Sequence, residues 1–287
     1  MLKFRKYGHW YFLGALALVA FFIWQAVFWI EAQRGRIAVH FFDVGQGDAM
    51  FIGAGNGTQV LVDGGPDSSI LAKLAETMPF WDRSLDLVIL THPHADHLSG
   101  LLRVLERYRV GLVLESGVNH SIAEYAAWRE RLGDQGVPVV TAKAGQRARL
   151  SDSAVLDILA PRRSFEGQSL RQVHDAMIVV KLTHGSTGVL LVGDAERSLE
   201  REFIASGADL DVDVLKVGHH GSKTSTSEEF LRATTPRLAV ISVGRKNRYG
   251  HPYQEVLDRL RQAGIAVLRT DQDGDITIVS DGSAFSY

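Results

Sequence analysis

Residues 91–100 read THPHADHLSG, which places three histidines and one aspartate within six positions, directly after the apolar run DLVIL. His92 and His94 are two residues apart, so their side chains project to the same side of an extended segment and can hold one metal ion together. Asp96 and His97 follow where the chain turns into a predicted helix, and they point to a neighbouring position. This spacing predicts two adjacent sites for divalent ions such as Zn²⁺ or Mn²⁺, which bind imidazole and carboxylate ligands.

The composition is that of a globular protein with one large domain or two small ones. The chain has 287 residues, 46% hydrophobic and 22% charged, and it contains no cysteine, so any metal must be held by His, Asp, Glu or backbone oxygen. Residues 1–36 hold five of the 31 Lys and Arg and one of the 33 Asp and Glu, which leaves a net charge of −6 for residues 37–287. Bulk charge therefore provides no attraction to nucleic acid, and a DNA substrate would need a local basic groove.

Residues 10–30, WYFLGALALVAFFIWQAVFWI, form a long apolar segment whose only strongly polar residue is Gln25. A helix of these 21 residues, rising about 1.5 Å per residue, can cross a hydrocarbon core of about 30 Å. The segment is long for a signal peptide, and no convincing small-residue cleavage site follows it. We therefore expect a transmembrane helix.

The charges that flank this segment predict its orientation. Lys3, Arg5 and Lys6 precede it, and positive charge is retained on the cytoplasmic side of a membrane. Arg34 and Arg36 follow it and reduce the asymmetry. The expected arrangement is a single-pass protein of the cell membrane, with a cytoplasmic start and a catalytic domain outside the cytoplasm.

The rest of the chain predicts a layered α/β domain. Twelve apolar runs indicate strands: IAVHFFDV, AMFI, TQVLVD, DLVILT, GLVLES, VPVVTA, AVLDILA, MIVVKLT, GVLLVGD, DVLKVG, RLAVISVG and DITIVS. Helical patterns lie between some of them, at 68–77, 99–108, 122–134, 197–206, 226–234 and 252–263. Strands first, and then strands alternating with helices, favour a single domain over residues 37–287, after a start, transmembrane helix and short linker over 1–36.

One further carboxylate follows an apolar run. Asp194 comes after GVLLV, so it is expected at a strand end that faces the same edge of the domain as HPHADH. Alternatively, Asp194 caps the helix predicted at 197–206.

Several motifs together resemble the metallo-β-lactamase superfamily. HPHADH after an apolar run, followed by VGDA at 192–195, is typical of it. Four more stretches resemble the nuclease domain of ComEC-type competence proteins: HFFDVGQGDA at 40–49, LVDGG at 61–65, KVGHHGSKTS at 216–225 and NRYGHP at 247–252. The resemblance covers roughly residues 38–281. It implies an αββα sandwich of two packed sheets with helices outside and metal ions at one edge between the sheets.

The resemblance also implies the metal ligands. They are His92 and His94 for the first ion, Asp96, His97 and His251 for the second, and Asp194 as a bridge between both. His219 or His220 could take the place of His251, or could contact a phosphoryl oxygen, and the sequence leaves these alternatives open.

His174 departs from the resemblance. ComEC-like domains usually carry an N-N-x-S stretch where this chain reads VHDAM at 173–177. His174 either completes the ligands of the first ion, as a histidine does in many relatives, or is a solvated loop histidine.

Other polar residues are expected to support the site. Asp63 in VDGG either hydrogen-bonds a ligand histidine and fixes its orientation or only serves the turn before two glycines. Asp43, Gln46 and Asp48 in DVGQGD are expected to shape the loop beneath the metal ions.

Donors for a phosphate group are expected near the same edge. Ser222, Lys223 and Thr224 suit an anion. Basic side chains that could neutralise the phosphates of DNA are Lys216, Lys223, Arg245, Lys246 and Arg248. For any single one of them, a solvated loop position is the simpler interpretation.

These residues favour phosphodiester hydrolysis. Two metal ions about 3.5–4 Å apart would generate a hydroxide near neutral pH and hold the attacked phosphorus, with Asp96, His219 and His220 as catalytic residues. The favoured hypothesis is a membrane-anchored nuclease that acts on DNA, linked to DNA uptake. The alternatives are a hydrolase of another ester, such as a cell-envelope phosphodiester or a phosphocholine ester, and a non-enzymatic membrane-anchored binding module, against which the full ligand set argues.

Overall fold

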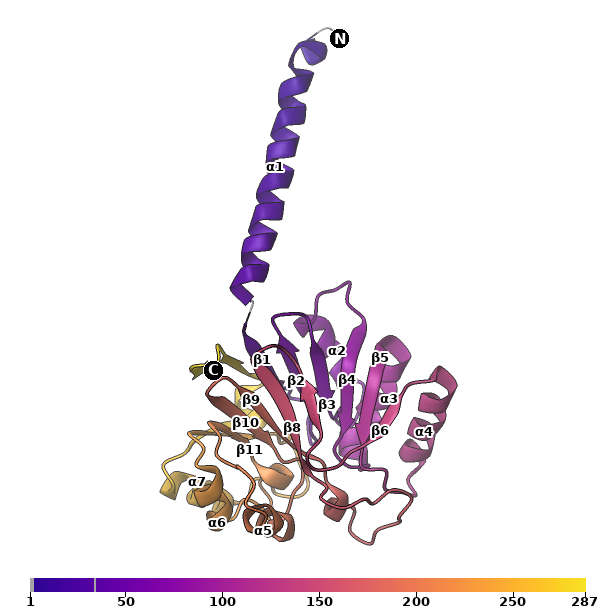
Figure 1. Ribbon diagram of the computed structural model, residues 1–287, viewed down its shortest axis with the longest axis vertical. Coiled ribbons are helices and arrows are strands. Elements are labelled where there is room, and N and C mark those ends of the chain that lie inside the picture. The colour runs from indigo at the N-terminus through magenta and orange to yellow at the C-terminus, as the bar shows by residue number, and fades with distance from the viewer. Residues whose placement is uncertain (1–2, 34) are drawn as a thin grey trace.

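The computed structural model describes residues 3–33 and 35–287. It begins with one long helix, α1 (Lys3–Gln33), which rises away from the rest of the chain (Figure 1). Its window Gly8–Gln25 has a mean hydropathy of 1.3 and none of it is buried, so by length and composition α1 could cross a membrane. Arg34 lies outside the described residues, as do the side chains of Lys3, Arg5 and Lys6, on which the predicted orientation depends.

Two mixed sheets form the centre of the domain. The first has eight strands in the order β15-β14-β1-β2-β3-β4-β5-β6. Their bounds are β1 Ile37–Phe41, β2 Met50–Ala54, β3 Gln59–Val62, β4 Ser84–Leu90, β5 Arg109–Glu115, β6 Val139–Thr141, β14 Ile276–Ser280 and β15 Phe285–Ser286. The second has seven strands in the order β13-β12-β11-β10-β9-β8-β7. Their bounds are β7 Arg147–Arg149, β8 Ala154–Ala160, β9 Val179–His184, β10 Thr187–Leu191, β11 Val214–Lys216, β12 Leu238–Ile241 and β13 Ala266–Arg269.

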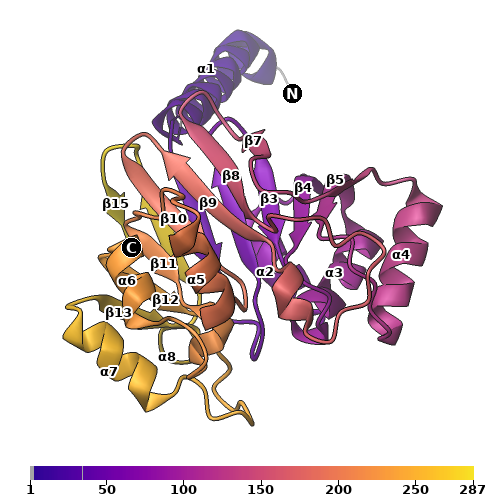
Figure 2. The same ribbon diagram turned by 60° about the horizontal axis from the view of Figure 1, so that its bottom comes forward.

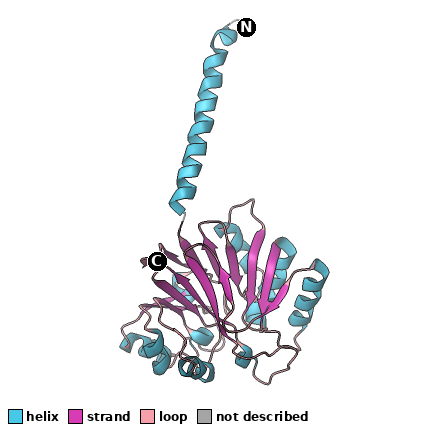
Figure 3. Ribbon diagram, viewed as in Figure 1, coloured by secondary structure: helices cyan, strands magenta, loops and turns pink. Residues whose placement is uncertain are grey.

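Helices cover the outer face of each sheet (Figures 2 and 3). The first sheet is covered by α2 (Ser69–Thr77), α3 (Ala95–Arg107) and α4 (Ala123–Gln135), and the second by α5 (Arg197–Ala205), α6 (Glu228–Thr234) and α7 (Gln254–Gln262). The remaining helical elements are α8 (Thr270–Asp273) and the short 3₁₀ turns η1 (Val173–Ala176) and η2 (Gly218–Gly221).

Three of the four hydrophobic clusters within residues 35–287 correspond to these layers. Side chains of both sheets meet in the middle, where Phe41 and Ile52 face Leu156 and Val180. Separate clusters join each sheet to its own helices. The predicted αββα sandwich is therefore confirmed, because each sheet buries both of its faces.

The predicted elements overlap the observed ones, but three strands, the three short helical elements α8, η1 and η2, and the start of one helix differ from the prediction. Strands β7, β13 and β15 were not predicted, because β7 is the charged stretch RAR, β15 has two residues, and β13 follows α7 after a short turn. The predicted start of a helix near Ser99 is wrong, since α3 begins at Ala95. The His94 carbonyl accepts hydrogen bonds from the N–H groups of His97 and Leu98, at 3.1 and 2.9 Å, and the carboxylate in the first turn favours an early start.

Strand direction brings the candidate residues to one edge. Strands β3, β4 and β5 are parallel, and so are β10, β11 and β12. Asp63 follows β3, His92 follows β4, and Asp194 follows β10. The predicted boundary between the anchor and the domain, at residues 36 and 37, falls between α1 and β1. This domain boundary stays a prediction.

Close packing of α3 against the turn after β3 holds His97 in place. The Gly64 N–H donates to the His97 carbonyl at 2.7 Å, and the Gly100 N–H donates to the Gly65 carbonyl at 3.0 Å. A Cβ at Gly100 would overlap the Gly64 carbonyl oxygen and lie 2.8 Å from the Asp67 carbonyl oxygen. The backbone of the turn after β3 therefore leaves no room for a side chain at Gly100.

We predict opposite effects for alanine at two helical glycines. Gly100→Ala should destabilise the protein by about 1–3 kcal/mol, because the backbone must move to admit the methyl group. Gly133→Ala in α4, where no atom lies within 4 Å of the added Cβ, should stabilise it by about 0.5–1 kcal/mol. Urea unfolding of both variants measures the difference, and equal effects would show that the α3 contact is not tight.

Candidate metal centre

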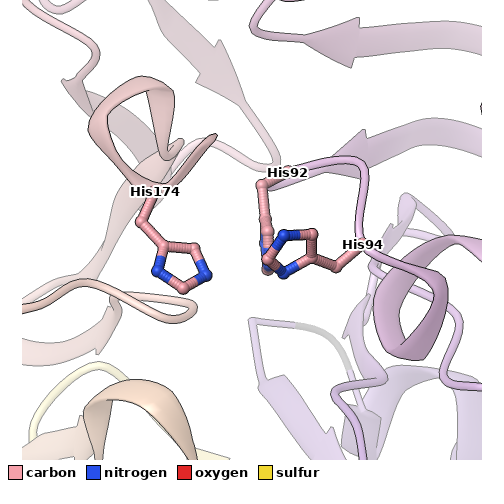
Figure 4. A group of neighbouring side chains, drawn as sticks. All are labelled: His92, His94 and His174. Carbon is pink, nitrogen blue, oxygen red and sulfur yellow. The ribbon is translucent and has the colours of Figure 1, made fainter. Parts of the chain in front are cut away.

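Three histidines from two segments meet at the first donor group. The ligand atoms of His92, His94 and His174 all lie within 4.8 Å of one another, and their rings point toward a common space (Figure 4). His92 Nε2 lies 3.0 Å from His94 Nδ1. His92 and His94 leave the end of β4, whereas His174 comes from η1, which precedes β9. The structure thus brings His174 to the HPHADH segment.

The second donor group contains two carboxylates and two histidines. Asp96, His97, Asp194 and His220 offer ligand atoms within 4.8 Å of one another. Asp194 Oδ2 lies 3.4 Å from His97 Nε2 and 3.5 Å from His220 Nε2. Both imidazoles are buried, while the Asp96 side chain is 32% exposed. Asp96 therefore forms the open side of this group.

Asp194 lies between the two groups. Its Oδ2 is 4.0 Å from His92 Nε2 in the first group, and it also shares a third donor group with His174 and His219. Asp194 does not cap α5, whose N-cap residue is Glu196. A carboxylate in this place could contact ions at both positions.

Asp63 orients histidines of both groups. Its carboxylate lies 2.8 Å from His97 Nδ1 and accepts the Thr91 hydroxyl at 2.6 Å, and Thr91 Oγ1 lies 3.1 Å from His92 Nδ1. Because a carboxylate can only accept, His97 Nδ1 carries a proton, and since the Thr91 proton is given to Asp63, the hydroxyl accepts from His92. The Nε2 atoms of both rings are thereby directed into the donor groups.

A strained turn positions His219 and His220. Both have left-handed backbone conformations, with φ of 46° and 53°, which are uncommon for residues other than glycine and cluster at functional sites. His220 Nδ1 donates to the Ser242 carbonyl at 2.9 Å, and His219 Nδ1 lies 3.2 Å from Glu196 Oε1. The Nε2 atoms of both rings face Asp194, at 3.5 and 3.7 Å.

A buried ion pair lies beneath the second group. Lys216 and Asp48 are both fully buried, and the Lys216 ammonium pairs with Asp48 and donates to the Gly193 carbonyl at 2.9 Å. Asp48 Oδ1 also lies 3.4 Å from His220 Nδ1. The expectation that Lys216 neutralises phosphate is wrong, because β11 directs this side chain into the core.

Burial and charge set the protonation of these groups. Burial lowers the pKa of His92 well below its usual value and that of His94 to about 4, so both rings are neutral near pH 7. Burial also opposes the charge of His97 and His220, but the negative charge of Asp194 and its neighbours outweighs it and raises the pKa of both rings. Burial opposes the charge of Asp194 too, but His220 and His97 hold its pKa well below the usual value.

The donor atoms fit divalent ions. Ten buried side-chain atoms have no hydrogen-bond partner within residues 3–33 and 35–287, and among them are His97 Nε2, His174 Nε2, His220 Nε2 and Asp194 Oδ1. Buried polar atoms are rarely left without a partner, and all four belong to the donor groups. Imidazole and carboxylate ligands of this kind suit zinc or manganese.

His251 lies outside both donor groups. Its ring is 6.5 Å from the His220 ring and 5.7 Å from the His219 ring, between centroids. The His251 backbone is held by Asn247, which accepts from its N–H at 2.9 Å and donates to its carbonyl at 2.7 Å. Of the alternatives left open by the sequence, the geometry favours His220 as the histidine of the second group.

The remaining predicted residues occupy the loops around this edge. Asp43 accepts the Gly45 N–H at 3.2 Å, and Gln46 accepts the Gly244 N–H at 3.2 Å, so both hold loop backbone. The Ser222 and Thr224 hydroxyls bond each other at 2.9 Å, and Thr224 donates to Glu196. These hydroxyls therefore support Glu196, which contacts His219. The basic side chains that remain exposed are Lys223, Arg245, Lys246 and Arg248.

Two residues near the site were not predicted from the sequence. Glu196 contacts His219 and Thr224, and its place two residues after Asp194 was a usable signal. His120 lies with its ring centroid 5.8 Å from that of His94. His120 precedes α4 in a loop without another His, Asp or Glu. The local sequence therefore gave no sign that His120 lies near the site.

Known proteins with similar sequences include competence proteins. The chain is 35% identical over 257 residues to ComE operon protein 3 of Bacillus subtilis (strain 168), covering 83% of this chain and 32% of that protein. It is 33% identical over 242 residues to Recombination protein 2 of Haemophilus influenzae (strain ATCC 51907 / DSM 11121 / KW20 / Rd), covering 82% and 28%. The chain thus spans about a third of the length of these relatives.

Solved structures with the same fold are more distant in sequence. The metallo-beta-lactamase fold protein YhfI from Bacillus subtilis aligns with a TM-score of 0.55 at 14% identity, covering 85% of this chain and 99% of that one. Igni18, a metallo hydrolase from Ignicoccus hospitalis KIN4/I, aligns with a TM-score of 0.54 at 16% identity, covering 84% and 98%. Residues 42–245 match the Metallo-beta-lactamase superfamily. Since this match spans more than half of the chain, the protein belongs to the metallo-β-lactamase superfamily, which indicates a metal-dependent hydrolase.

Proposed function

We propose that this protein is a membrane-anchored, metal-dependent phosphodiesterase that cleaves DNA. The observation that carries the proposal is the meeting of two donor groups at Asp194, on the open edge of the sandwich. Relatives that are named as competence and recombination proteins favour DNA over other phosphodiesters.

The proposed ligands follow the donor groups. His92, His94 and His174 would hold a first divalent ion, and Asp96, His97 and His220 a second, with Asp194 shared. Two such ions lower the pKa of a water molecule and offset the charge of a phosphoryl group. We take zinc or manganese as the ions.

The protein's own groups would orient the reactants. Asp96 is partly exposed beside His97 and His220. Burial opposes its charge, but the neighbouring His97 and His220 lower the pKa of Asp96, so it remains a carboxylate near pH 7. As an anion, Asp96 can accept a hydrogen bond from the attacking water and direct it toward phosphorus.

The open edge also offers groups for the phosphate. His219 is 25% exposed, with its Nδ1 beside Glu196, so its Nε2 can contact a phosphoryl oxygen. Lys223 and Arg248 are exposed, and they lie over the rings of Tyr253 and Tyr249. We propose that these cations contact the DNA backbone on either side of the cleaved bond.

The full chain in detergent, loaded with Mn²⁺ or Zn²⁺, should cleave single-stranded or double-stranded DNA and lose that activity with a chelator. Asp96→Asn should lower turnover by a factor on the order of 10²–10⁴ with little change in substrate affinity, because the nucleophile loses its orienting anion. Bis(p-nitrophenyl) phosphate and a phosphocholine ester are assayed in parallel.

Asp134→Asn, on the exposed face of α4, is the matched control and should retain parent turnover. If the enzyme cleaves the small esters but not DNA, DNA is not its substrate and the proposal must name another ester. An Asp96→Asn enzyme that is as fast as the parent would remove Asp96 from the mechanism.

We further propose that α1 anchors the domain outside the cytoplasm. Three basic residues precede the apolar segment and two follow it, so the asymmetry favours a cytoplasmic N-terminus. A C-terminal green fluorescent protein fusion in a bacterial host should be dark after export, and an alkaline phosphatase fusion should be active. The reverse pattern would place the domain in the cytoplasm.

A further inference from the structure

Two adjacent aromatic side chains are exposed on a connection far from the metal centre. Phe80 is 78% exposed and Trp81 is 73% exposed, in the segment between α2 and β4. Their ring centroids are 4.8 Å apart, with an edge-to-face angle of 83°. No other large apolar side chain of the domain is as exposed among residues 35–287. Two neighbouring aromatic rings in water indicate a contact surface more than single scattered residues do.

This connection lies at the edge of the sandwich from which α1 emerges. Strand β1 begins directly after α1, β1 and β2 are antiparallel, β2 and β3 are antiparallel, and β3 and β4 are parallel. Strands β1 and β4 therefore run in the same direction and begin at the same edge. Trp81 precedes the start of β4 at Ser84, and Figure 1 shows the connection rising beside the lower end of α1.

The short link between α1 and β1 keeps this edge near the end of the helix. Only residues 34–36 separate Gln33 from Ile37, and an extended chain spans at most about 3.5 Å per residue, which gives about 14 Å. Strand β4 is three strand spacings from β1 in the sheet, or about 15 Å to the side. An aromatic pair in that place can reach the surface of any bilayer that α1 crosses.

Two arginines lie next to the segment that carries the aromatic pair. Arg83 and Arg109 are exposed, and neither forms an ion pair within the part of the chain that the structure describes. Arg83 donates to the Tyr108 hydroxyl at 3.1 Å, and its carbonyl accepts the Arg109 N–H at 2.8 Å, so the two residues are adjacent where β4 and β5 begin. The nearby Asp82 carboxylate is engaged by Gln59 and Ser84. Aromatic and basic side chains together suit the headgroup layer of a phospholipid bilayer.

We propose that the connection at residues 78–83 is a second membrane anchor, in which Phe80 and Trp81 insert into the headgroup layer of the bilayer that α1 crosses. This inference rests on the proposed membrane anchoring by α1. It gives the domain a fixed orientation: the metal centre follows the other end of β4, seven residues away, or about 23 Å at 3.3 Å per residue. The open edge then faces away from the lipid, where a strand of DNA has access.

Because the chain has no cysteine, single cysteines give unique labelling sites. Full chains carrying Phe80→Cys, Leu16→Cys in α1, or Tyr249→Cys beside the metal centre are labelled with an environment-sensitive fluorophore. Each is placed in nanodiscs of equal parts phosphatidylcholine and phosphatidylglycerol. The Phe80 and Leu16 probes should lose most of their emission to lipid-attached nitroxide and resist aqueous iodide. The Tyr249 probe should behave in the opposite way.

Each other outcome has a separate meaning. If lipid nitroxide quenches the Leu16 probe but iodide quenches the Phe80 probe, the second anchor is overturned and the helix anchor remains. A Leu16 probe in water would overturn both. A Phe80 probe shielded from iodide but not reached by lipid nitroxide would assign the rings to a protein contact. Lipid quenching at Tyr249 would overturn the proposed orientation.

Discussion

The structure depends on how three buried carboxylates, Asp48, Asp63 and Asp194, are neutralised at one edge of a two-sheet sandwich. A buried anion is tolerated only where cations or several hydrogen-bond donors face it. Asp63 accepts from Thr91 and lies beside His97, and Asp48 pairs with Lys216. Asp194 is left with imidazoles, whose pKa it raises at His97 and His220. The same negative charge that holds protons on these rings would also attract a divalent ion, which releases those protons when it binds.

The fold supplies these groups through strand ends and close backbone contacts. Parallel strands in each sheet end at the same edge, so short turns after β3, β4, β10 and β11 present the carboxylates and histidines to one another. Helix α3 approaches the turn after β3 so closely that Gly100 admits no side chain. Packing of α3 against this turn therefore fixes the position of His97 at the site.

The sequence predicted the layers and the place of HPHADH and Asp194, because apolar runs and strand-end positions are local signals. It could not choose between His220 and His251, since the choice depends on the left-handed turn at His219 and His220 and on the Ser242 carbonyl, which is 22 residues away. It placed Lys216 among exposed cations because a lysine within KVGHHGSKTS carries no sign of its partner Asp48, which lies in the loop before β2. His174 was left open, since only the fold brings η1 to the end of β4.

If divalent ions complete the charge balance of this edge, the metal content of the purified full chain is the most direct test. Elemental analysis should find about two divalent ions per chain, about one in His94→Ala, and a lower Tm after chelation that zinc or manganese restores, because an ion bound only by the folded state stabilises it. A chain that holds no metal after purification, and whose Tm is unchanged by chelator and by added zinc or manganese, would contradict the account.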